Sequence, residues 1–471
     1  MKRTILLCLL ALGTIGFSTA NPIDEKLAKK IAKNFYWERG ASLHGLDYSD
    51  LMLKHTYTKE VNSANLYYVF DVFFNDKNGF IIVAADDDVY PVWVYSYTSN
   101  YSHNDQPAAF VEWIDNYKAQ ILYTKSNALK ADINITDEWS RLETLDKTKN
   151  IKSTKAVGPL LQTTWRQTEY YNALSPYHTS SPWDNRCPVG CVATAMAQIM
   201  KYWEYPTQGT GSHSYISNYA GYNFGTQTAN FGATTYNWSN MPNSLSAPNN
   251  DVATLCYHVG VSVEMSYTPM GSGAYSSKPA PALINYFKYA SSAQFVVEST
   301  YTGNWESLLK GELDATPARP FIYRGESTSN AGHSFICDGY QGTNHFHFVF
   351  GENSMNDNYF YLASINPGTF DFSDDHQATV GIIPIGVSID ENTSNDNMKI
   401  YPNPVSDKLF IEIDGTESIQ LRLINVLGKV VLSKEVENST SIEVANLSSG
   451  IYFIEILNAK NQKTVKKIII E

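Results

Sequence analysis

The chain has 471 residues, of which 43% are hydrophobic and 17% charged, an ordinary composition for a globular protein. Its length predicts roughly three domains. The formal net charge of -12, with no basic run, argues against nucleic acid as a partner. The 32 tyrosines and 9 tryptophans suit a β-rich fold with broad clefts, although tyrosine is also common on the surface of exported proteins.

The N-terminal residues 1–20 have the pattern of a secretory signal peptide. Lys2 and Arg3 precede an apolar run over residues 5–15, and small residues at 18–20 form a cleavage signature. The run is shorter than the ~20 residues that a membrane-spanning helix needs, and no later segment comes closer. We therefore predict a soluble exported protein with no membrane span, from which Cys8 is removed.

Residues 21–155 have the pattern of an α+β domain. An amphipathic helix is predicted at 24–40, strands at 65–74 and 79–97, and a second helix near 108–123. The segment ends in the polar, lysine-bearing stretch DKTKNIKSTKAVGP, which is typical of an exposed linker that proteases can cut.

Residues 156–387 contain most of the histidines and the glycine-rich loops, and we expect the functional site there. The polar segment SIDENTSNDN then forms a linker at 388–397, before a tail of different character at 398–471.

The tail alternates apolar and polar residues, as at Leu409, Ile411 and Ile413, and predicts a small antiparallel sandwich of about seven short strands. Its strings YPNP, LINVLGKVV and NLSSGIYFIEI resemble the C-terminal sorting domain of proteins exported by the type IX secretion system of Bacteroidetes. The resemblance implies the type IX machinery as a partner. It also implies a secreted or cell-surface location in a Gram-negative bacterium, with the tail removed or anchored after export. The alternative is a generic sandwich, such as a sugar-binding module.

The stretch CPVGCVATAMAQIMKYWEYP at 187–206 contains two of the four remaining cysteines; the others are Cys256 and Cys337. Nearly every residue over 192–203 is apolar, which predicts a helix that is buried almost all round and ends at Pro206. Gly190 permits a tight turn into this helix, so the Cys191 sulfur would lie beside the unpaired amides at its N-terminus. These amides and the helix dipole stabilise a thiolate, whereas Cys187 lies outside the helix.

A nucleophilic thiol needs a base, and seven histidines follow the linker at positions 178, 213, 258, 333, 345, 347 and 376. His333 differs from the others, because a glycine-containing turn places it at the start of a predicted strand in STSNAGHSFICDGY. It also lies 142 residues after Cys191, within the roughly 130 to 150 that separate the two groups in papain-like enzymes.

Three strings, GCVATAMAQIMKYWEYP, VGPLLQTTWRQTEYYN and GHSFICDGY, together resemble the streptopain family of secreted cysteine proteases over residues 21–387. The resemblance implies an α+β fold: a papain-like core of two subdomains at 156–387 that follows an inhibitory α+β prodomain at 21–155. The small all-β sandwich at 398–471 would complete the chain.

By position, the resemblance implies that Cys191 is the nucleophile and His333 the general base. Gln167 would lend a side-chain amide to the oxyanion hole. The loop at 266–277 would close over bound substrate, with Ser272 and Gly273 near its tip, and Gly332 would line the same cleft.

Two alternatives remain for the cysteine pair. A structural disulfide between Cys187 and Cys191 would occupy the reactive sulfur, although a reversible regulatory bond is compatible with activity. A zinc site is disfavoured because Cys256 and Cys337 stand alone, whereas structural zinc usually takes paired short spacings. We therefore expect no metal and no cofactor.

The family carries an NWGWGG string after its histidine, but this chain has HFHFVFGENSMNDNYFYL. Without gaps, Val349 falls where the Asn belongs, and Phe350 and Glu352 fall at the two Trp positions. Val349 has no side-chain acceptor to orient the histidine. The side chain of Asn353 is the predicted substitute, with Glu352 as its competitor and a backbone carbonyl or water as the alternative.

The sequence thus predicts a secreted cysteine endopeptidase that is made as a proenzyme and acts on protein or peptide substrates. Its own prodomain would be a further partner. The rival from another class is a catalytically silent protein of the same fold that acts as a binding or inhibitory module.

Overall fold

The structure is a computed structural model of the chain. It describes residues 22–104, 106–146, 155–326, 332–352, 357–362, 376–385, 398–413, 419–425, 430–436, 440–448, 450–457 and 463–470. The contacts within the chain divide it into two units, Met1–Ile383 and Pro384–Glu471. The predicted signal peptide at 1–20 and the predicted linker at 388–397 lie outside the described residues. No helix among the described residues is both long and apolar enough to cross a lipid bilayer.

The first unit begins with a helix, a meander of four strands and two more helices. These elements are α1 (Glu25–His44), β1 (Met52–Val61), β2 (Ala64–Phe74), β3 (Lys77–Ala84), β4 (Val92–Ser96), α2 (Ala108–Ser126) and α3 (Ile133–Glu143). The carboxylate of Asp24 caps α1 by accepting the Leu27 N–H at 2.7 Å, and Gly45 ends the helix in the left-handed conformation.

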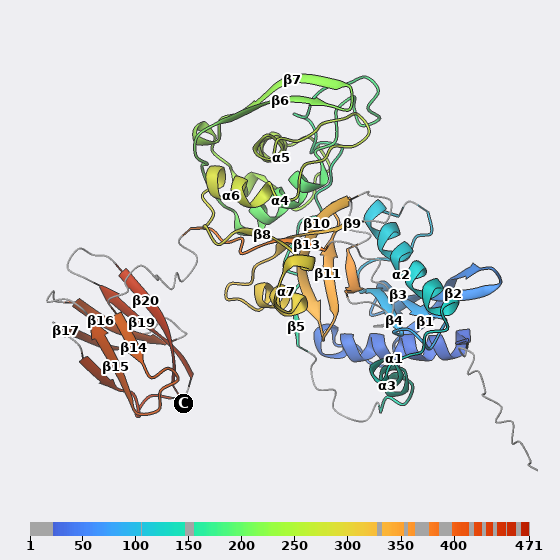
Figure 1. Ribbon diagram of the computed structural model, residues 1–471, viewed down its shortest axis with the longest axis horizontal. Helices are drawn as coiled ribbons and strands as arrows, with labels where there is room; N and C mark the ends of the chain where they lie inside the picture. Colours follow the sequence, from blue (N-terminus) through green and yellow to red (C-terminus); the bar gives the residue numbers. More distant parts are fainter. Residues whose placement is uncertain are drawn as a thin grey trace, which may run out of the picture. The chain divides into compact units, whose positions relative to one another are not determined.

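The four-strand meander continues into the strands that follow it in the chain, so that one large sheet runs through the first unit (Figure 1). The later strands are β5 (Ala156–Val157), β8 (Gln294–Val297), β9 (Phe321–Glu326), β10 (Gly332–Gln341), β11 (His345–Val349), β12 (Asn358–Tyr361) and β13 (Gln377–Val380). The order of pairing is β1-β2-β3-β4-β12-β11-β10-β9-β13-β8, and β5 pairs with β10. The join lies between β4 and β12, where Tyr95 pairs with Tyr359 in antiparallel register.

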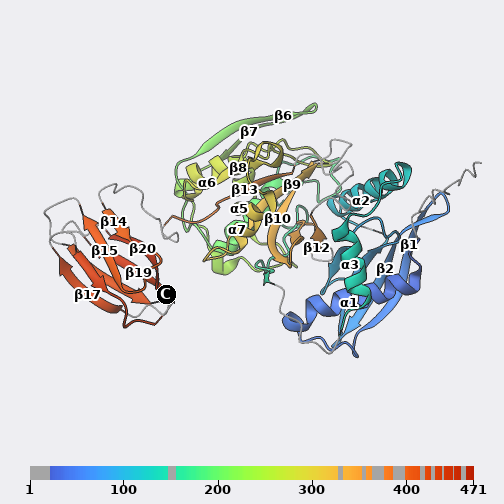
Figure 2. The same cartoon turned by 60° about the horizontal axis from the view of Figure 1, so that its bottom comes forward.

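A helical layer covers one end of this sheet, where Figures 1 and 2 place it beside β8, β13 and β10. Its helices are α4 (Cys191–Trp203), α5 (Asn250–Ser262) and α6 (Pro279–Phe287), and the strands β6 (His213–Tyr219) and β7 (Tyr222–Ala229) form a separate two-stranded sheet. Helix α7 (Trp305–Leu313) packs on β10. The short 3-10 turns are η1 (Phe231–Ala233), η2 (Trp238–Asn240) and η3 (Glu298–Thr300).

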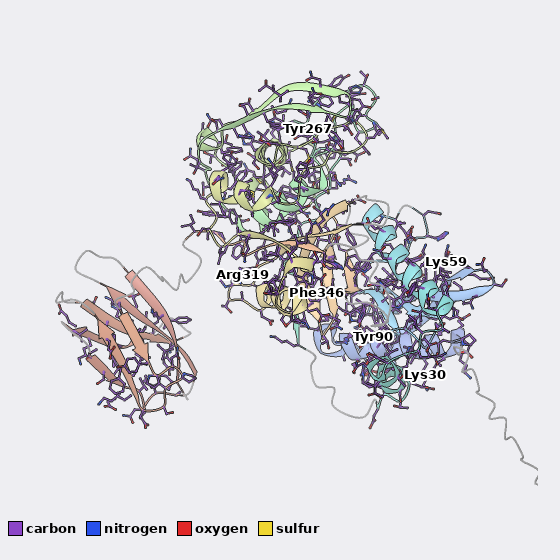
Figure 3. The ribbon with its side chains drawn as sticks, viewed as in Figure 1. Lys30, Lys59, Tyr90, Tyr267, Arg319 and Phe346 are labelled. Carbon is purple, nitrogen blue, oxygen red and sulfur yellow. The ribbon has the colours of Figure 1, made fainter. Side chains whose placement is uncertain are left out.

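Two apolar cores hold the first unit together. One joins the N-terminal elements to the sheet and includes Trp93 and Phe346. The other surrounds α4 and includes Met196 and Tyr267. Figure 3 labels Phe346 and Tyr267, which lie in these two separate parts of the unit. Helix α4 packs against β10, and Ile336 of β10 belongs to the second core.

The predicted buried helix is confirmed. Helix α4 spans Cys191–Trp203, and every residue from Val192 to Met200 is buried. Glu204, whose φ of 45° is left-handed, caps the end of the helix two residues before Pro206. In residues 21–155, the predicted helices and the strand at 65–74 are confirmed by α1, α2 and β2. The predicted strand run at 79–97 forms two strands, β3 and β4, and β1 was not predicted.

Helix α3 was not predicted, although the sequence carries its signals. Asp132 caps the helix by accepting the Ile135 N–H at 2.9 Å, and the buried residues Ile135, Trp139 and Leu142 follow helical spacing. Most of the predicted cuttable linker, residues 147–154, lies outside the described residues.

The second unit is a sandwich of seven strands among the described residues, as predicted. Its strands are β14 (Met398–Tyr401), β15 (Lys408–Ile413), β16 (Ile419–Asn425), β17 (Val430–Val436), β18 (Thr440–Glu443), β19 (Gly450–Leu457) and β20 (Lys463–Ile470). They form two antiparallel sheets, β14-β15-β18 and β17-β16-β19-β20. The predicted alternation places Leu409 and Ile411 in the core, together with Ile454 and Ile456.

Candidate active site

Gly190 sets the position of Cys191. Its φ of 93° is left-handed, and a Cβ there would lie 2.5 Å from the Met265 sulfur and 3.0 Å from the Ser272 carbonyl oxygen. A larger residue would therefore be strained and would collide with two neighbouring segments. The chain turns tightly at this point, and Cys191 becomes the first residue of α4.

The surroundings of Cys191 favour its charged form. Burial alone would raise the pKa of the thiol, but the positive charge and hydrogen bond of His333 outweigh burial. The backbone N–H groups of Ser334 and Val192 also donate to the sulfur, and the net pKa lies below the ordinary value. The helix N-terminus thus contributes directly through the Val192 amide.

His333 lies at the start of β10, where it pairs with Gly325 of β9. Burial alone would lower the pKa of its imidazole, but the charge and hydrogen bond of Cys191 raise it. The charge of Glu352 and the Phe350 carbonyl add to this effect, and the pKa rises to about 9. At neutral pH the two groups therefore favour a thiolate beside an imidazolium.

The orientation of the imidazole is set by a backbone carbonyl. Nε2 of His333 donates to the main-chain oxygen of Phe350 at 3.1 Å, which leaves Nδ1 for the sulfur. The backbone N–H of Phe350 donates in turn to Asp357 at 3.1 Å. Asn353, the predicted orienting residue, lies outside the described residues.

Aromatic rings pack behind the histidine. The Phe335 ring lies nearly parallel to that of His333, with ring centroids 6.1 Å apart. The buried Phe350 ring packs edge-on against Phe335 at 5.0 Å and against Phe360 at 5.4 Å. The ring of Phe350, which falls at the first Trp position of the family's string, therefore packs behind Phe335 and not directly against the imidazole.

A cleft of about 480 Å³ opens at these two groups. Of the predicted site residues, five line it together, namely Gln167, Cys191, Ser272, Gly332 and His333. Gly273 is not among its lining residues and lies instead at the base of the predicted loop, where it pairs with Ser266. Glu352 and the exposed Met270 also line the cleft.

Gln167 is tied to the helix that carries the cysteine. The main-chain carbonyl oxygen of Gln167 accepts the Val189 N–H at 2.8 Å, just before the turn at Gly190. Two residues earlier, the Trp165 N–H donates to Oε1 of Gln198, a buried residue of α4, at 3.1 Å. The segment that contains Gln167 is therefore fixed relative to α4 at both of these points.

The other cysteines differ from Cys191. Cys187, Cys256 and Cys337 are buried, and all four described cysteines are free thiols, so the disulfide alternative is wrong for this structure. Burial raises the pKa of Cys187 to about 11 and that of Cys256 to about 12. Of these thiols, only Cys191 is activated.

A buried pair near the site, His347 with Asp338, was not predicted. Nδ1 of His347 lies 2.6 Å from Asp338, whose other oxygen accepts the Leu161 N–H at 2.9 Å. Burial opposes protonation of His347, but the charge of Asp338 raises its pKa. Burial also raises the pKa of nearby Asp357 to about 7. Sequence gave no signal for this group, because His347 and Asp338 come together only across the β10–β11 pair.

Comparisons with known proteins match three parts of the chain. Residues 165–360 match the Peptidase C10 family, residues 20–121 the Spi protease inhibitor family, and residues 399–471 the secretion system C-terminal sorting domain. Gln167, Cys191 and His333 all lie within the first of these matches.

Two curated relatives match most of this chain. Streptopain of Streptococcus pyogenes is 29% identical over 424 residues, which cover 80% of this chain and 98% of the relative. The thiol protease/hemagglutinin PrtT of Porphyromonas gingivalis is 28% identical over 429 residues. The match covers 86% of this chain but 46% of PrtT, so the chain spans about half the length of that relative.

A solved structure of a prointerpain A fragment from Prevotella intermedia is 30% identical, with a TM-score of 0.55. It covers 69% of this chain and 98% of the fragment. The predicted α+β fold, with a prodomain before the protease core, is confirmed by this likeness. The chain therefore belongs to the Peptidase C10 family, the streptopain family of cysteine proteases.

Proposed function

We propose that this protein is a secreted cysteine endopeptidase, made as a proenzyme, that hydrolyses peptide bonds through Cys191 and His333. The observation that carries the proposal is the activated thiol at the start of α4, paired with an imidazole whose pKa is raised to about 9. A thiolate and an imidazolium that line the same cleft are the two groups that thiol-based acyl transfer requires.

In the proposed reaction, the Cys191 thiolate attacks the scissile carbonyl carbon and forms a tetrahedral intermediate. Its oxyanion is stabilised by the Gln167 side-chain amide and the Cys191 backbone N–H. His333 gives its Nδ1 proton to the leaving amine as the C–N bond breaks. It then takes a proton from water, which attacks the thioester and releases the acid and the thiolate.

The prodomain is proposed to hold this site inactive. Helix α2 lies against the sheet beside the catalytic histidine, and a small cavity of about 20 Å³ is lined by Trp113 and Glu112 from the helix and by His333 and Gly325 from the sheet. The match of residues 20–121 to the Spi protease inhibitor family supports the same role. Cutting within residues 146–155 would then release activity.

The tail is proposed to direct export. Residues 399–471 match the secretion system C-terminal sorting domain, and the sandwich is a unit of its own. The type IX machinery would be its partner, and the mature enzyme would be released or held at the cell surface.

A thiol-directed, irreversible active-site probe tests the proposed function. The purified chain, cut within residues 146–155, is treated with the probe and mapped by mass spectrometry, and casein digestion is followed in parallel. Labelling of Cys191 alone, with loss of digestion in proportion, is the expected result. A chain that binds casein without cutting it, and whose Cys191 reacts no faster than a free thiol, would instead be the silent binding protein.

A further inference from the structure

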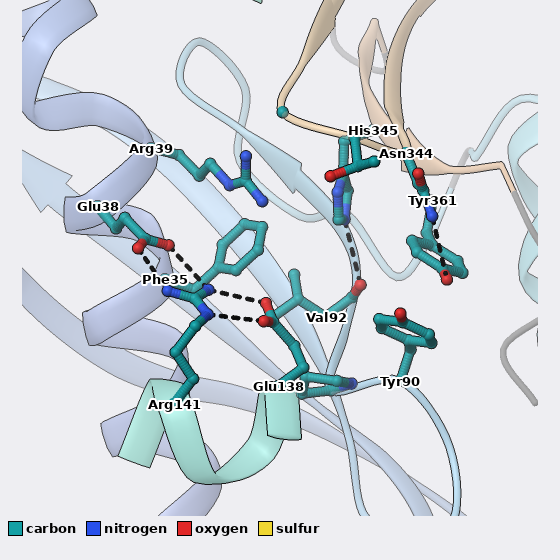
Figure 4. Close-up of a pocket in the computed structure, with 13 residues that line it drawn as sticks. Phe35, Glu38, Arg39, Tyr90, Val92, Glu138, Arg141, Asn344, His345 and Tyr361 are labelled. Atoms are coloured by element: carbon teal, nitrogen blue, oxygen red, sulfur yellow. Dashed lines mark hydrogen bonds and ion pairs between the residues drawn. The ribbon is translucent and has the colours of Figure 1, made fainter. Parts of the chain in front are cut away.

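A second pocket, of about 320 Å³, shares no lining residue with the catalytic cleft; Figure 4 shows it in close-up. Its walls come from α1, α3 and the segment before β4 on one side, and from the turn between β10 and β11 with β12 on the other. Both the N-terminal segment and the protease core therefore contribute to it.

Arg39 is the unusual residue of this pocket. Its side chain reaches from α1 over the Phe35 ring, with the guanidinium carbon 5.0 Å from the ring centroid. The residue is only 8% exposed, and its Nε and Nη1 atoms are buried with no hydrogen-bond partner among the described residues. A buried charge without a partner is destabilising, because its lost hydration is not replaced.

The neighbouring carboxylates do not neutralise Arg39. Glu38 and Glu138 both bind Arg141, with Nη2 3.0 Å from Glu38 and Nε 2.7 Å from Glu138, as the dashed lines in Figure 4 show. Arg141 thus has two carboxylates and Arg39 has neither. The charges of the four residues balance overall, but one positive charge remains localised at Arg39.

The turn between β10 and β11 closes over this charge. Gly342 has a left-handed φ of 64°, and a Cβ there would lie 1.8 Å from Nη1 of Arg39. The next strand begins with His345, whose Nε2 donates to the Val92 carbonyl at 3.2 Å. Burial, together with the charge of Arg39, lowers the pKa of His345 to about 3, so this neighbour is neutral at physiological pH.

The remaining wall is aromatic. The rings of Tyr90 and Tyr361 lie 4.6 Å apart between centroids, and Phe35 and His345 complete the lining around the guanidinium. The volume is at the lower end of the range for small-molecule sites, which are mostly apolar with a few placed polar groups.

We propose that this pocket binds a small monocarboxylate, with its carboxylate on Arg39 and its apolar body against the rings of Phe35, Tyr90 and Tyr361. A guanidinium matches a carboxylate in shape and hydrogen-bonding geometry. A monocarboxylate offers one negative charge to Arg39, whereas a phosphate dianion would place two negative charges beside Glu38 and Glu138. Because both sides of the junction line the pocket, the bound ligand strengthens the contact between the N-terminal segment and the protease core.

The test uses phenylacetate as the probe and the full chain carrying Cys191→Ala, which keeps the chain uncut whether or not it is a protease. Calorimetry is expected to show saturable binding of one phenylacetate per chain and a rise in the melting temperature. Phenylacetamide has the same shape without the charge, and we expect it to bind at least about tenfold more weakly. This comparison of two ligands needs no change in the pocket.

Arg39→Met is expected to weaken phenylacetate binding by about tenfold or more. Lys30→Met is the matched control, since it removes one positive charge from an exposed site on the same helix, where Lys30 pairs with Glu143 at 3.5 Å. Equal affinity in the Arg39 and Lys30 variants would overturn the proposal, as would equal affinity for the two ligands or no saturable binding. Binding of inorganic phosphate in place of phenylacetate would show that the ligand class is wrong. None of these outcomes bears on proteolysis, so the proposal fails or holds separately from the proposed function.

Discussion

The acceptor for Nε2 of His333 is the main-chain oxygen of Phe350, 3.1 Å away. A backbone carbonyl is available from any residue type, and it does not change charge with pH. The family's Asn position can therefore hold Val349, a buried residue of β11, without leaving the imidazole unoriented. The side chains around Phe350 then decide how firmly this carbonyl is held.

Asp357 is expected to position the histidine through Phe350. Its carboxylate accepts the Phe350 N–H at 3.1 Å, so Asp357→Ala would leave that amide without this acceptor and loosen the carbonyl that holds His333. We expect kcat to fall by about tenfold or more with KM changed by less than about twofold, because the substrate groove is untouched. Asp357→Asn keeps an acceptor oxygen and is expected to retain most of the activity.

Asn353→Ala is the informative companion variant, since Asn353 was predicted to orient the histidine. If the Phe350 carbonyl is enough to orient His333, the kcat of Asn353→Ala should stay within about twofold of the parent enzyme. A loss of about tenfold in Asn353→Ala, with little effect in Asp357→Ala, would assign the orienting role to Asn353 and contradict the role given to Asp357.

The thiols differ enough for a clean mutational test. Cys191→Ala is expected to abolish digestion of casein, because it removes the nucleophile, while the melting temperature stays close to that of the parent. Cys187→Ala is expected to keep activity within about threefold, with the modest destabilisation typical of trimming a buried side chain. Both variants are measured by initial rates on matched amounts of folded protein. Equal loss of activity in the two would contradict the assignment of Cys191 alone.

The pair of shifted pKa values predicts a broad window of activity. As pH falls through the lowered pKa of Cys191, the thiolate is protonated and the rate drops. As pH rises through about 9, His333 loses the proton that the leaving amine needs, and the rate drops again. The dependence of kcat/KM on pH from 4 to 11 checks both limbs.

His333→Ala separates the effect of His333 on the Cys191 pKa from the effect of the helix N-terminus. Without the imidazolium, the Cys191 pKa should return toward an ordinary value of about 8.5, so alkylation by iodoacetamide at pH 6 should slow by roughly a hundredfold. If the alkylation rate at pH 6 is unchanged in His333→Ala, the helix N-terminus rather than His333 activates the thiol.

The parts of the site that sequence predicted are those with local signals. Gly190 before an apolar run predicts both the turn and Cys191 at the helix start, and the glycine-containing turn before His333 predicts its place at the start of a strand. The Phe350 carbonyl carried no such signal, because every residue has one. Likewise, the pairing of Tyr95 with Tyr359 joins strands far apart in the chain, and only the folded structure brings them together.

The sandwich is expected to serve export alone. Deleting residues 398–471 should leave kcat/KM unchanged in vitro, since Cys191, His333 and their contacts all lie in the first unit. In the producing cell, the truncated protein should remain inside, which fractionation and immunoblotting of cells and medium would reveal. Secretion of the truncated protein at the parental level would show that these residues are not the export signal.

Trp113 is expected to be the main anchor of the prodomain near His333. Its ring, from α2, lies 5.2 Å from Phe348 and 5.5 Å from Phe360 between centroids, and the residue is 8% exposed. Trp→Ala changes at buried sites commonly cost about 3–5 kcal/mol, which corresponds to roughly a hundredfold or more in the population of the undocked prodomain. In the uncut full chain, Trp113→Ala should therefore speed the labelling of Cys191 by the thiol-directed probe.

The matched control is Val111→Ala, a change on the same helix at a residue that is 39% exposed. Because Val111 faces solvent to this extent, its variant should label at a rate within about threefold of the parent. Gel electrophoresis confirms that each sample is uncut before labelling, so that faster labelling reports loosening of the prodomain and not its removal. If Trp113→Ala labels no faster than Val111→Ala, α2 does not control access to Cys191, and the block must come from another part of residues 21–155.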